Sequence, residues 1–429
     1  MTLAARRPDP GLKHGAGPLA VALAVAALTA AAPAWAQQAT PFSSSVGGPV
    51  PGGAETVFDV ATSLEYSSNI AGSNAQLAAA RGLKLADVIF TPAADFTIAR
   101  QLGRPLVYVN GSASYAVYTI NPVRDRPRFD VDGGATGRFG PCQETLTGGY
   151  AHSQTDIEEL ALKVVNNTAQ TADVGLAAHC GRSTGLTPTF SVQQSWLSNS
   201  AAIERVIDNR TFTADVGVGY TRPSIGTLSL FGNYSDTTYP NRRFLIFTGG
   251  HPNVLVDDFV TYGGGVRFER PVGARISVTA TLGYTSLKAN LPGSASFNGL
   301  TYTADVNYAV SSRLSTHAQA VRSTTPSTRP GGNFTLKTIY EADVSYRLGS
   351  RYTVEISAQR DTEDFPGASV QTTFDLTHEV GYREMLIVNY KMSKRLQFSL
   401  AGGEVDRQAN FPGLSYSATT VTLTAHAGF

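Results

Sequence analysis

Apolar and polar residues alternate one by one along most of this chain, from residue 54 to its last residue. The clearest stretches are 211–222, 301–310 and 338–348, where aromatic or aliphatic side chains take every second position and polar residues or glycine take the others. A period of two places successive side chains on opposite faces of a β-strand. The pattern therefore predicts an all-β protein whose strands each have one apolar and one polar face.

The segments between these stretches alternate in length. Short turns, such as those near 100–104, 222–226 and 349–351, alternate with longer polar loops, such as 236–257 and 361–375. In outer-membrane barrels the turns are short on the periplasmic side and the loops are long outside. The spacing predicts an antiparallel, up-and-down transmembrane β-barrel of about eighteen strands, with both termini in the periplasm. Sixteen strands is the alternative, because two of the weaker segments could merge or slip.

The final stretch, residues 415–429, alternates up to its last residue, with Val421, Leu423 and Phe429 on one face. In a soluble protein such a strand would be a sticky edge. In a membrane barrel it closes the sheet by pairing with the first strand. The ending is similar to the C-terminal signature of bacterial outer-membrane barrels. We therefore expect Phe429, Leu423 and Val421 to be the assembly signal for the barrel assembly machinery, with an edge strand of a soluble sandwich as the alternative.

The N-terminal region has the features of an export signal. Three basic residues precede an apolar run at 19–32, and the small-x-small sequence at 34–36 is typical of a cleavage site. Residues 1–36 are therefore predicted to be a cleaved signal peptide, followed by a flexible periplasmic tail at 37–53 that is rich in Pro, Gly and Ser. The barrel is expected to cover residues 54–429.

Composition supports a membrane barrel and excludes one class of partner. Charged residues make up 16% of the chain, whereas roughly 25% is typical of soluble domains. Hydrophobic residues are only 42%, which suits strands with one polar face. The net charge of +1 gives no reason to expect a nucleic-acid partner. The expected surroundings are outer-membrane lipid and lipopolysaccharide.

Charged residues share the strand face of Gly, Ser and Thr, opposite the apolar residues. This face is predicted to line a wetted lumen with charges of both signs and an acidic excess in the first third of the barrel, which does not fit a strongly anion-selective pore. The lumen-facing candidates are Asp59, Asp95, Tyr108, Asp215, Phe231, Arg267, Arg275, Asp305, Glu341, Asp343, Arg347 and Glu355.

The chain has two cysteines, Cys142 and Cys180. In the predicted strand map, Cys142 opens one strand of a hairpin and Cys180 closes the next, so the two residues face each other at the periplasmic end. Both share the parity of the apolar face of their strands. Because the compartment outside the inner membrane is oxidising, a disulfide is expected, with two free thiols as the alternative.

No catalytic motif is present in the sequence. There is no His-Glu-x-x-His, no Gly-x-Ser-x-Gly and no P-loop, and the seven histidines are scattered. We expect no enzymatic activity, no cofactor and no metal site. Two acidic groups, Asp257-Asp258 and the segment 361–364, fall in predicted loops and are interpreted as solvated charge, with cation binding as the alternative.

Two stretches near the start of the barrel carry a family resemblance. Residues 61–70 end in Tyr-Ser-Ser-Asn-Ile, and the strand at 87–95 has a central Thr-Pro. This layout resembles the putative β-barrel porin type 2 group of proteobacterial outer-membrane proteins, which are often associated with exopolysaccharide production. In this sequence Ser68 stands where the group usually has Asp.

Three functions remain open from the sequence. The resemblance implies a channel accessory to exopolysaccharide export or biosynthesis, with polysaccharide export components as partners. The barrel alone implies a general diffusion porin for small hydrophilic solutes. A structural or adhesive barrel without an open pore is the third hypothesis, because function depends on the lumen and loops rather than on the fold.

Overall fold

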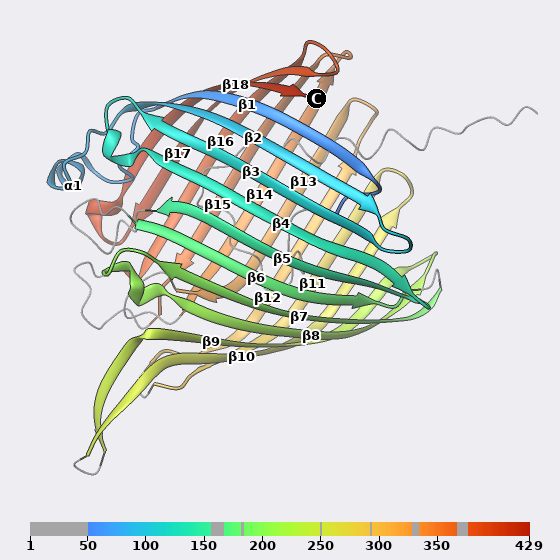
Figure 1. The fold of residues 1–429 in the computed structure, drawn as a ribbon, viewed down its shortest axis with the longest axis horizontal. Helices are drawn as coiled ribbons and strands as arrows, with labels where there is room; N and C mark the ends of the chain where they lie inside the picture. Colours follow the sequence, from blue (N-terminus) through green and yellow to red (C-terminus); the bar gives the residue numbers. More distant parts are fainter. Residues whose placement is uncertain are drawn as a thin grey trace, which may run out of the picture. The chain divides into compact units, whose positions relative to one another are not determined.

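The structure is a computed structural model that describes residues 50–155, 167–181, 184–248, 251–291, 294–327, 334–366 and 376–429. The predicted signal peptide and most of the predicted tail lie outside these residues. The described chain forms eighteen antiparallel strands in one sheet (Figure 1). The strands are β1 Glu55–Ser67, β2 Asp87–Gln101, β3 Leu106–Tyr118, β4 Arg126–Phe139, β5 Cys142–Thr155, β6 Asn167–His179, β7 Gly185–Asn199, β8 Asn209–Arg222, β9 Gly226–Thr248, β10 His251–Val272, β11 Ile276–Ala289, β12 Phe297–Ala309, β13 Leu314–Pro326, β14 Phe334–Leu348, β15 Tyr352–Asp364, β16 His378–Lys391, β17 Leu396–Ala409 and β18 Tyr416–Gly428.

The sheet closes on itself. Each strand pairs with its neighbours in sequence, and β1 pairs with β18 over the register Asp59–Gly428 to Ser67–Thr420. Closure satisfies the backbone groups that an open edge would leave unpaired in lipid. The prediction of an up-and-down barrel is confirmed, with eighteen strands and not sixteen.

The two ends of the barrel differ. At one end, here called the short-turn end, tight turns join β2 to β3 and every second pair after it, and the first residue of β1 and Phe429 lie there too. Glycine makes two of these turns possible: Gly273 and Gly349 have φ of 63° and 69°, a left-handed conformation that a side chain disfavours. The other end, the long-loop end, has the longer connections.

The apolar face of each strand points away from the lumen. Phe58 and Leu64 are 45% and 50% exposed on β1, and Leu230 is 61% exposed on β9. Directly paired residues share a face, so the inner face is the polar one along the whole ring. This inverted arrangement is what a lipid-facing barrel requires.

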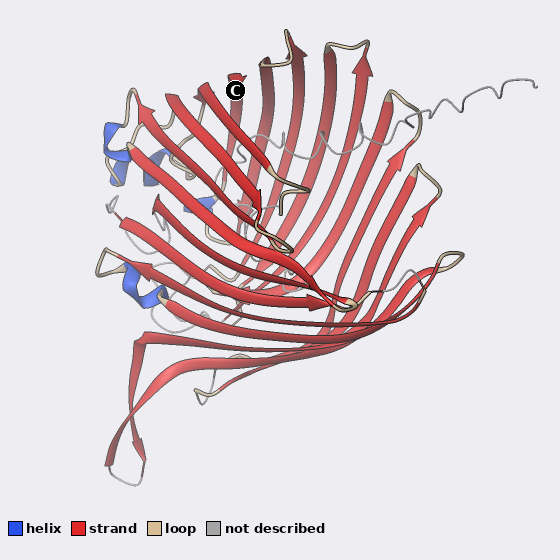
Figure 2. Ribbon diagram, turned by 45° about the vertical axis from the view of Figure 1, so that its right-hand side comes forward, coloured by secondary structure: helices blue, strands red, loops and turns tan. Residues whose placement is uncertain are grey.

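The part of the chain that the structure describes has four short helices, which lie at the long-loop end (Figure 2). They are α1 Ala75–Ala80, η1 Pro122–Arg124, η2 Glu204–Ile207 and η3 Pro412–Leu414. A small apolar cluster joins three connections there, because Phe365, Leu376 and Leu414 are buried together and Leu77 of α1 packs against them. Among the described residues, no helix is long and apolar enough to cross a membrane.

The hairpin of β9 and β10 corrects one sequence prediction. The segment 236–257 was expected to be a loop, but β9 and β10 continue as a paired ribbon beyond their neighbours (Figure 1). The pairing shifts between Val256 and Asp257, so β9 carries a bulge there. The bulge lets Arg242 lie 3.8 Å from the centre of the Tyr239 ring and 3.3 Å from the Asp257 carboxylate. Asp257 is therefore a buried ion-pair partner and not solvated loop charge.

The second predicted acidic loop is also partly strand. Strand β15 continues through Asp364, so residues 361–364 belong to the barrel wall. Asp364 accepts a hydrogen bond from His378 on β16, with Nδ1 and Oδ1 2.7 Å apart. The sequence did not predict a strand here, because residues 361–364 at the long-loop end of β15 are polar on both faces and so show no alternation of apolar and polar residues.

Candidate functional site: the lumen wall

Most of the predicted lumen residues lie on the inner face of the barrel. Register pairs carry this face from strand to strand, as in Asp59 opposite Asp95 and Asp215 opposite Asn233. Arg275 is the exception, because it lies exposed in the turn between β10 and β11 and on no strand face. The predicted residues on inward positions of strands are Asp59, Asp95, Tyr108, Asp215, Phe231, Arg267, Asp305, Glu341, Asp343, Arg347 and Glu355.

Five carboxylates form an acidic row across β1 to β6, made of Asp59, Asp95, Asp130, Asp132 and Asp173. Asp59 and Asp95 are direct register partners, and Ser112 lies between Asp95 and Asp130 on the strand that separates them. Asp95 interacts electrostatically with both Asp59 and Asp130. His426 also interacts with Asp95, and Arg128 shares the inner face of β4, but the five carboxylates outnumber them, so the row gives this wall an excess of negative charge.

Hydrogen bonds and glycines hold the acidic row in place. Ser112 donates to Asp130, and Asn110 donates to Asp132 over 2.9 Å. A side chain at Gly149 would place its Cβ 2.7 Å from Oδ1 of Asp173, so this glycine makes room for that carboxylate. Hydrogen bonds and close packing therefore fix the positions of these carboxylates on the wall.

We expect a pore formed by this barrel to be cation-selective, because fixed negative charge concentrates cations in a confined channel. The double substitution Asp95→Asn and Asp130→Asn should move the reversal potential in a potassium chloride gradient toward zero in planar bilayers. Glu144→Gln is the matched control, since this carboxylate shares the strand face of Leu146 and points away from the lumen. Unchanged selectivity in the double variant would contradict the role of the row.

The two predicted lumen aromatics do not project into the channel. Tyr108 is 1% exposed, and a Cβ at Gly134 would lie 2.9 Å from its hydroxyl, so the ring lies flat over this glycine. The ring of Phe231 also lies along the inner wall, and its Cζ would be 3.4 Å from a Cβ at Gly283. Gly134 on the adjacent strand therefore accepts the ring of Tyr108, and Gly283, two strands from β9, accepts the edge of Phe231, which stays half-exposed along the wall.

A second charged group lies on β12, β13 and β14, here called the histidine–carboxylate cluster: Asp305, His317, Glu341 and Asp343. Nε2 of His317 is 2.8 Å from Oδ2 of Asp305, and Nδ1 is 2.7 Å from Oδ2 of Asp343. Ligand atoms of His317, Glu341 and Asp343 all lie within 4.8 Å of one another. Because β12 and β3 are nine positions apart in an eighteen-strand ring, this cluster faces the acidic row across the lumen (Figure 1).

Three further ion pairs on the inner face include residues that the sequence did not single out. Lys337 and Glu363 lie 2.5 Å apart, and Arg407 and Glu379 lie 2.6 Å apart, near the long-loop end of β14 to β17. Their signal in the sequence is parity alone, since each shares the face of the predicted lumen residues. The third pair, Arg267 with Glu269 at 2.6 Å, is more exposed and joins one predicted residue to its neighbour on the same face of β10.

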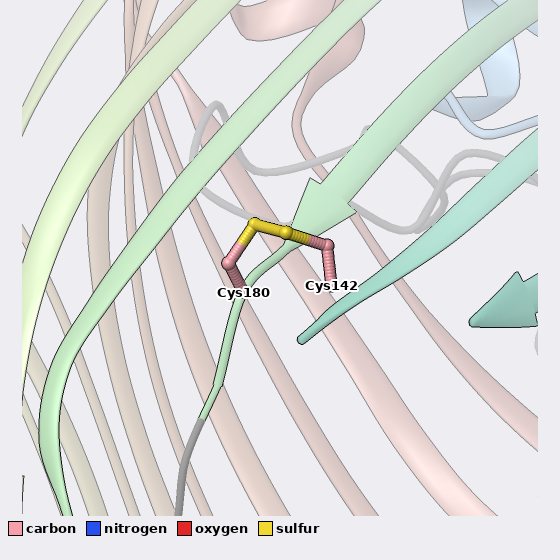
Figure 3. Close-up of a disulfide and its surroundings, with 2 residues drawn as sticks. All are labelled: Cys142 and Cys180. Atoms are coloured by element: carbon pink, nitrogen blue, oxygen red, sulfur yellow. A yellow bond between two sulfur atoms is a disulfide. The ribbon is translucent and has the colours of Figure 1, made fainter. Parts of the chain in front are cut away.

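The structure joins Cys142 and Cys180 in a disulfide at the short-turn end of β5 and β6 (Figure 3). The neighbouring register pair is Gln143 with His179, so the cysteines meet as hairpin partners.

We expect no reactive thiol in unreduced, denatured protein, which thiol labelling would check. A crosslink over a sequence separation of 38 contributes on the order of 3–4 kcal/mol in the chain-entropy model. Since the barrel already constrains this hairpin, the double Cys→Ser variant should lose less stability than that in denaturant titrations. Labelling of two thiols in the unreduced wild type would mean that the bond does not form.

The closed sheet, its inverted faces and its polar inner wall define an outer-membrane β-barrel of the porin kind. Residues 258–429 match the family model described as putative beta-barrel porin 2. The match confirms the resemblance and covers the second part of the barrel, whereas the stretches that first carried the resemblance lie in and around β1 and β2. Fold and family match place the protein in the outer membrane of a Gram-negative bacterium, in contact with membrane lipid and lipopolysaccharide.

Solved outer-membrane barrels resemble the chain in structure. The outer-membrane protein OpdK from Pseudomonas aeruginosa has 10% sequence identity and a TM-score of 0.46, with 87% of this chain and 99% of that chain covered. The siderophore receptor PirA from Acinetobacter baumannii has 8% identity and a TM-score of 0.46, with 89% of this chain and 81% of that chain covered. No curated protein matches the sequence.

Proposed function

We propose that this protein is an outer-membrane channel through which a hydrophilic saccharide chain passes, as an accessory of exopolysaccharide export. The observation that supports it is the inner wall, whose residues are half-exposed and polar rather than packed into a core. On β18, for example, Thr420, Thr422 and Thr424 face inward and keep part of their surface open. A barrel of this strand number is wide enough for an aqueous channel.

The wall chemistry suits a sugar chain that slides without a deep binding well. Hydroxyl, amide and carboxylate groups exchange hydrogen bonds with sugar hydroxyls at little net cost. The acidic row favours a neutral or cationic chain over a polyanionic one, because like charges would repel a polyanion in the confined lumen.

The proposal also sets an orientation. The short-turn end, with both ends of the described barrel, faces the periplasm, where turns of such barrels are short. The barrel assembly machinery would read the closing strand that ends at Phe429, and polysaccharide export components would deliver the chain to this end. The proposed role contains no enzymatic step and needs no cofactor.

A general diffusion porin is the second candidate. The absence of projecting rings at Tyr108 and Phe231 favours it, since sugar-specific pores use aromatic surfaces to bind their substrate. Carboxylates predominate on both facing walls, in the acidic row and in the histidine–carboxylate cluster with Arg383 nearby, which would also suit small cations and neutral solutes.

Bilayer conductance and a deletion strain together test the proposal. We expect the purified barrel to open a conducting pore, and the deletion strain to lose surface polysaccharide until the wild-type gene is restored. A conducting pore with unchanged polysaccharide would replace export by general diffusion. A barrel that neither conducts nor changes the polysaccharide would leave only a structural role.

A further inference from the structure

We propose that His317, Glu341 and Asp343 form a binding site for a divalent transition-metal ion of the zinc class on the lumen wall. The three side chains come from β13 and β14, which are paired so that His317 lies directly opposite Asp343. Their ligand atoms lie within 4.8 Å of one another. The site goes beyond the channel function, because it concerns what the wall itself binds.

The donor set fits such an ion. Zinc binds imidazole nitrogen and carboxylate oxygen at about 2.0–2.2 Å, so its ligand atoms lie within roughly 4.4 Å of each other. Nδ1 of His317 and Oδ2 of Asp343 now share a hydrogen bond at 2.7 Å. Two ligands of a tetrahedral ion lie roughly 3.4 Å apart, so the metal would displace the shared proton and rotate the Asp343 and Glu341 carboxylates. Lumen water can complete the coordination, since all three residues are only partly buried. Calcium and magnesium prefer all-oxygen sites, so the imidazole selects against them.

Asp305 supplies the second shell that a metal-binding histidine needs. Its Oδ2 is 2.8 Å from Nε2 of His317, on the side of the ring away from Asp343. A histidine that binds a metal almost always donates its other ring N–H to a carboxylate or carbonyl, which fixes the orientation of the ring. With Nε2 held by Asp305, Nδ1 is the nitrogen that is directed at Asp343 and the metal.

The local charge also favours a dication. Glu341 interacts with one permanently charged cation, Arg383, with the imidazole of His317 and with the carboxylates of Asp343 and Asp305. Glu355 adds a further carboxylate beside Asp343. Carboxylates therefore exceed cations in this part of the wall, and a bound divalent ion would offset the excess.

Zinc titration of the purified full-length barrel in detergent tests the site by isothermal calorimetry. We expect one site of high affinity in the wild type and its loss in His317→Ala. Asp305→Asn should keep the site but weaken it by roughly 10–100-fold, the usual effect of removing a second-shell partner. Magnesium in place of zinc should bind far more weakly.

His378→Ala is the matched control, because His378 pairs with a single carboxylate, Asp364, over 2.7 Å at the long-loop end. It should leave zinc binding unchanged, and all variants should keep the heat-modifiable folded form. Zinc binding that is absent from the wild type, or that persists in His317→Ala, would overturn the site. The calorimetric result does not depend on conduction, so failure of the channel proposal would show in bilayers and leave the metal site standing.

Discussion

Replacing Gly403 by alanine is expected to destabilise the barrel strongly, whereas the same change at Gly402 should have little effect. Gly403 faces the lumen on β17, between Met385 of β16 and Thr420 of β18. A Cβ there would run into the backbone carbonyl oxygen of Glu384 and would lie 3.2 Å from Cα of Met385. Overpacking that forces side chains off their rotamers and shifts the backbone costs about 1–3 kcal/mol, and occasionally more. Here the obstacle is backbone, so we expect at least the upper end of that range.

Gly402 provides the control at the next position in the chain. It points outward, and a Cβ there would meet only the carbonyl oxygen of Thr420, at 3.9 Å, an ordinary van der Waals contact. Folding is measured from the compact form in unheated detergent gels and from urea titration of the refolded barrel in micelles. Equal folding of the two variants would show that β16 and β17 can separate enough to accept a side chain at Gly403.

Deletion of Phe429 should strongly reduce assembly in the outer membrane. The Phe429 backbone N–H donates to the Phe58 carbonyl oxygen over 2.9 Å, and the two rings lie 6.3 Å apart, so this residue fastens β18 to β1 at the short-turn end. Its side chain is 72% exposed, which leaves it accessible as a recognition signal. Loss of the residue removes a closing contact and the signal together.

Membrane fractions from cells would measure this effect as the amount of heat-modifiable barrel. Phe429→Tyr is the control, because it keeps an aromatic ring and the backbone hydrogen bond, and it should assemble nearly as well as the wild type. Deletion of the predicted tail, residues 37–53, should also have a smaller effect than loss of Phe429. If the Phe429 deletion assembled normally, the closing strand would not carry the signal.

The barrel itself was predictable because its main signals are local. Strand alternation needs only neighbouring residues, and the alternation of short and long connections fixes an even, antiparallel order. The same parity placed Asp59, Asp95 and Asp343 on the inner face. The cysteine pair was within reach too, because hairpin neighbours such as Cys142 and Cys180 depend on a single turn.

The sequence predictions were wrong where the local alternation of residues does not reflect the geometry of the sheet. Residues 236–257 read as a loop because Pro240 and a run of polar residues interrupt the alternation, yet the bulge beside Asp257 lets the two strands continue. Arg275 has the parity of a lumen residue but lies in a turn, where alternation no longer sets direction. Tyr108 has the right face, but only the glycine on the next strand shows that its ring lies flat.

Sequence by itself determined the strand type and which face of each strand is polar, because a period of two is a property of the chain, and it limited the strand number to about eighteen or sixteen. The tertiary structure decided which inward residues meet. Asp305, His317 and Asp343 belong to three strands, and their contacts depend on the register of two separate pairings, β12 with β13 and β13 with β14. A register shift of two residues in either pairing would keep every polar side chain inside but would separate the residues of the histidine–carboxylate cluster. Register is set by hydrogen bonds across the whole ring and by the closure of β1 on β18, and no single stretch of sequence encodes it.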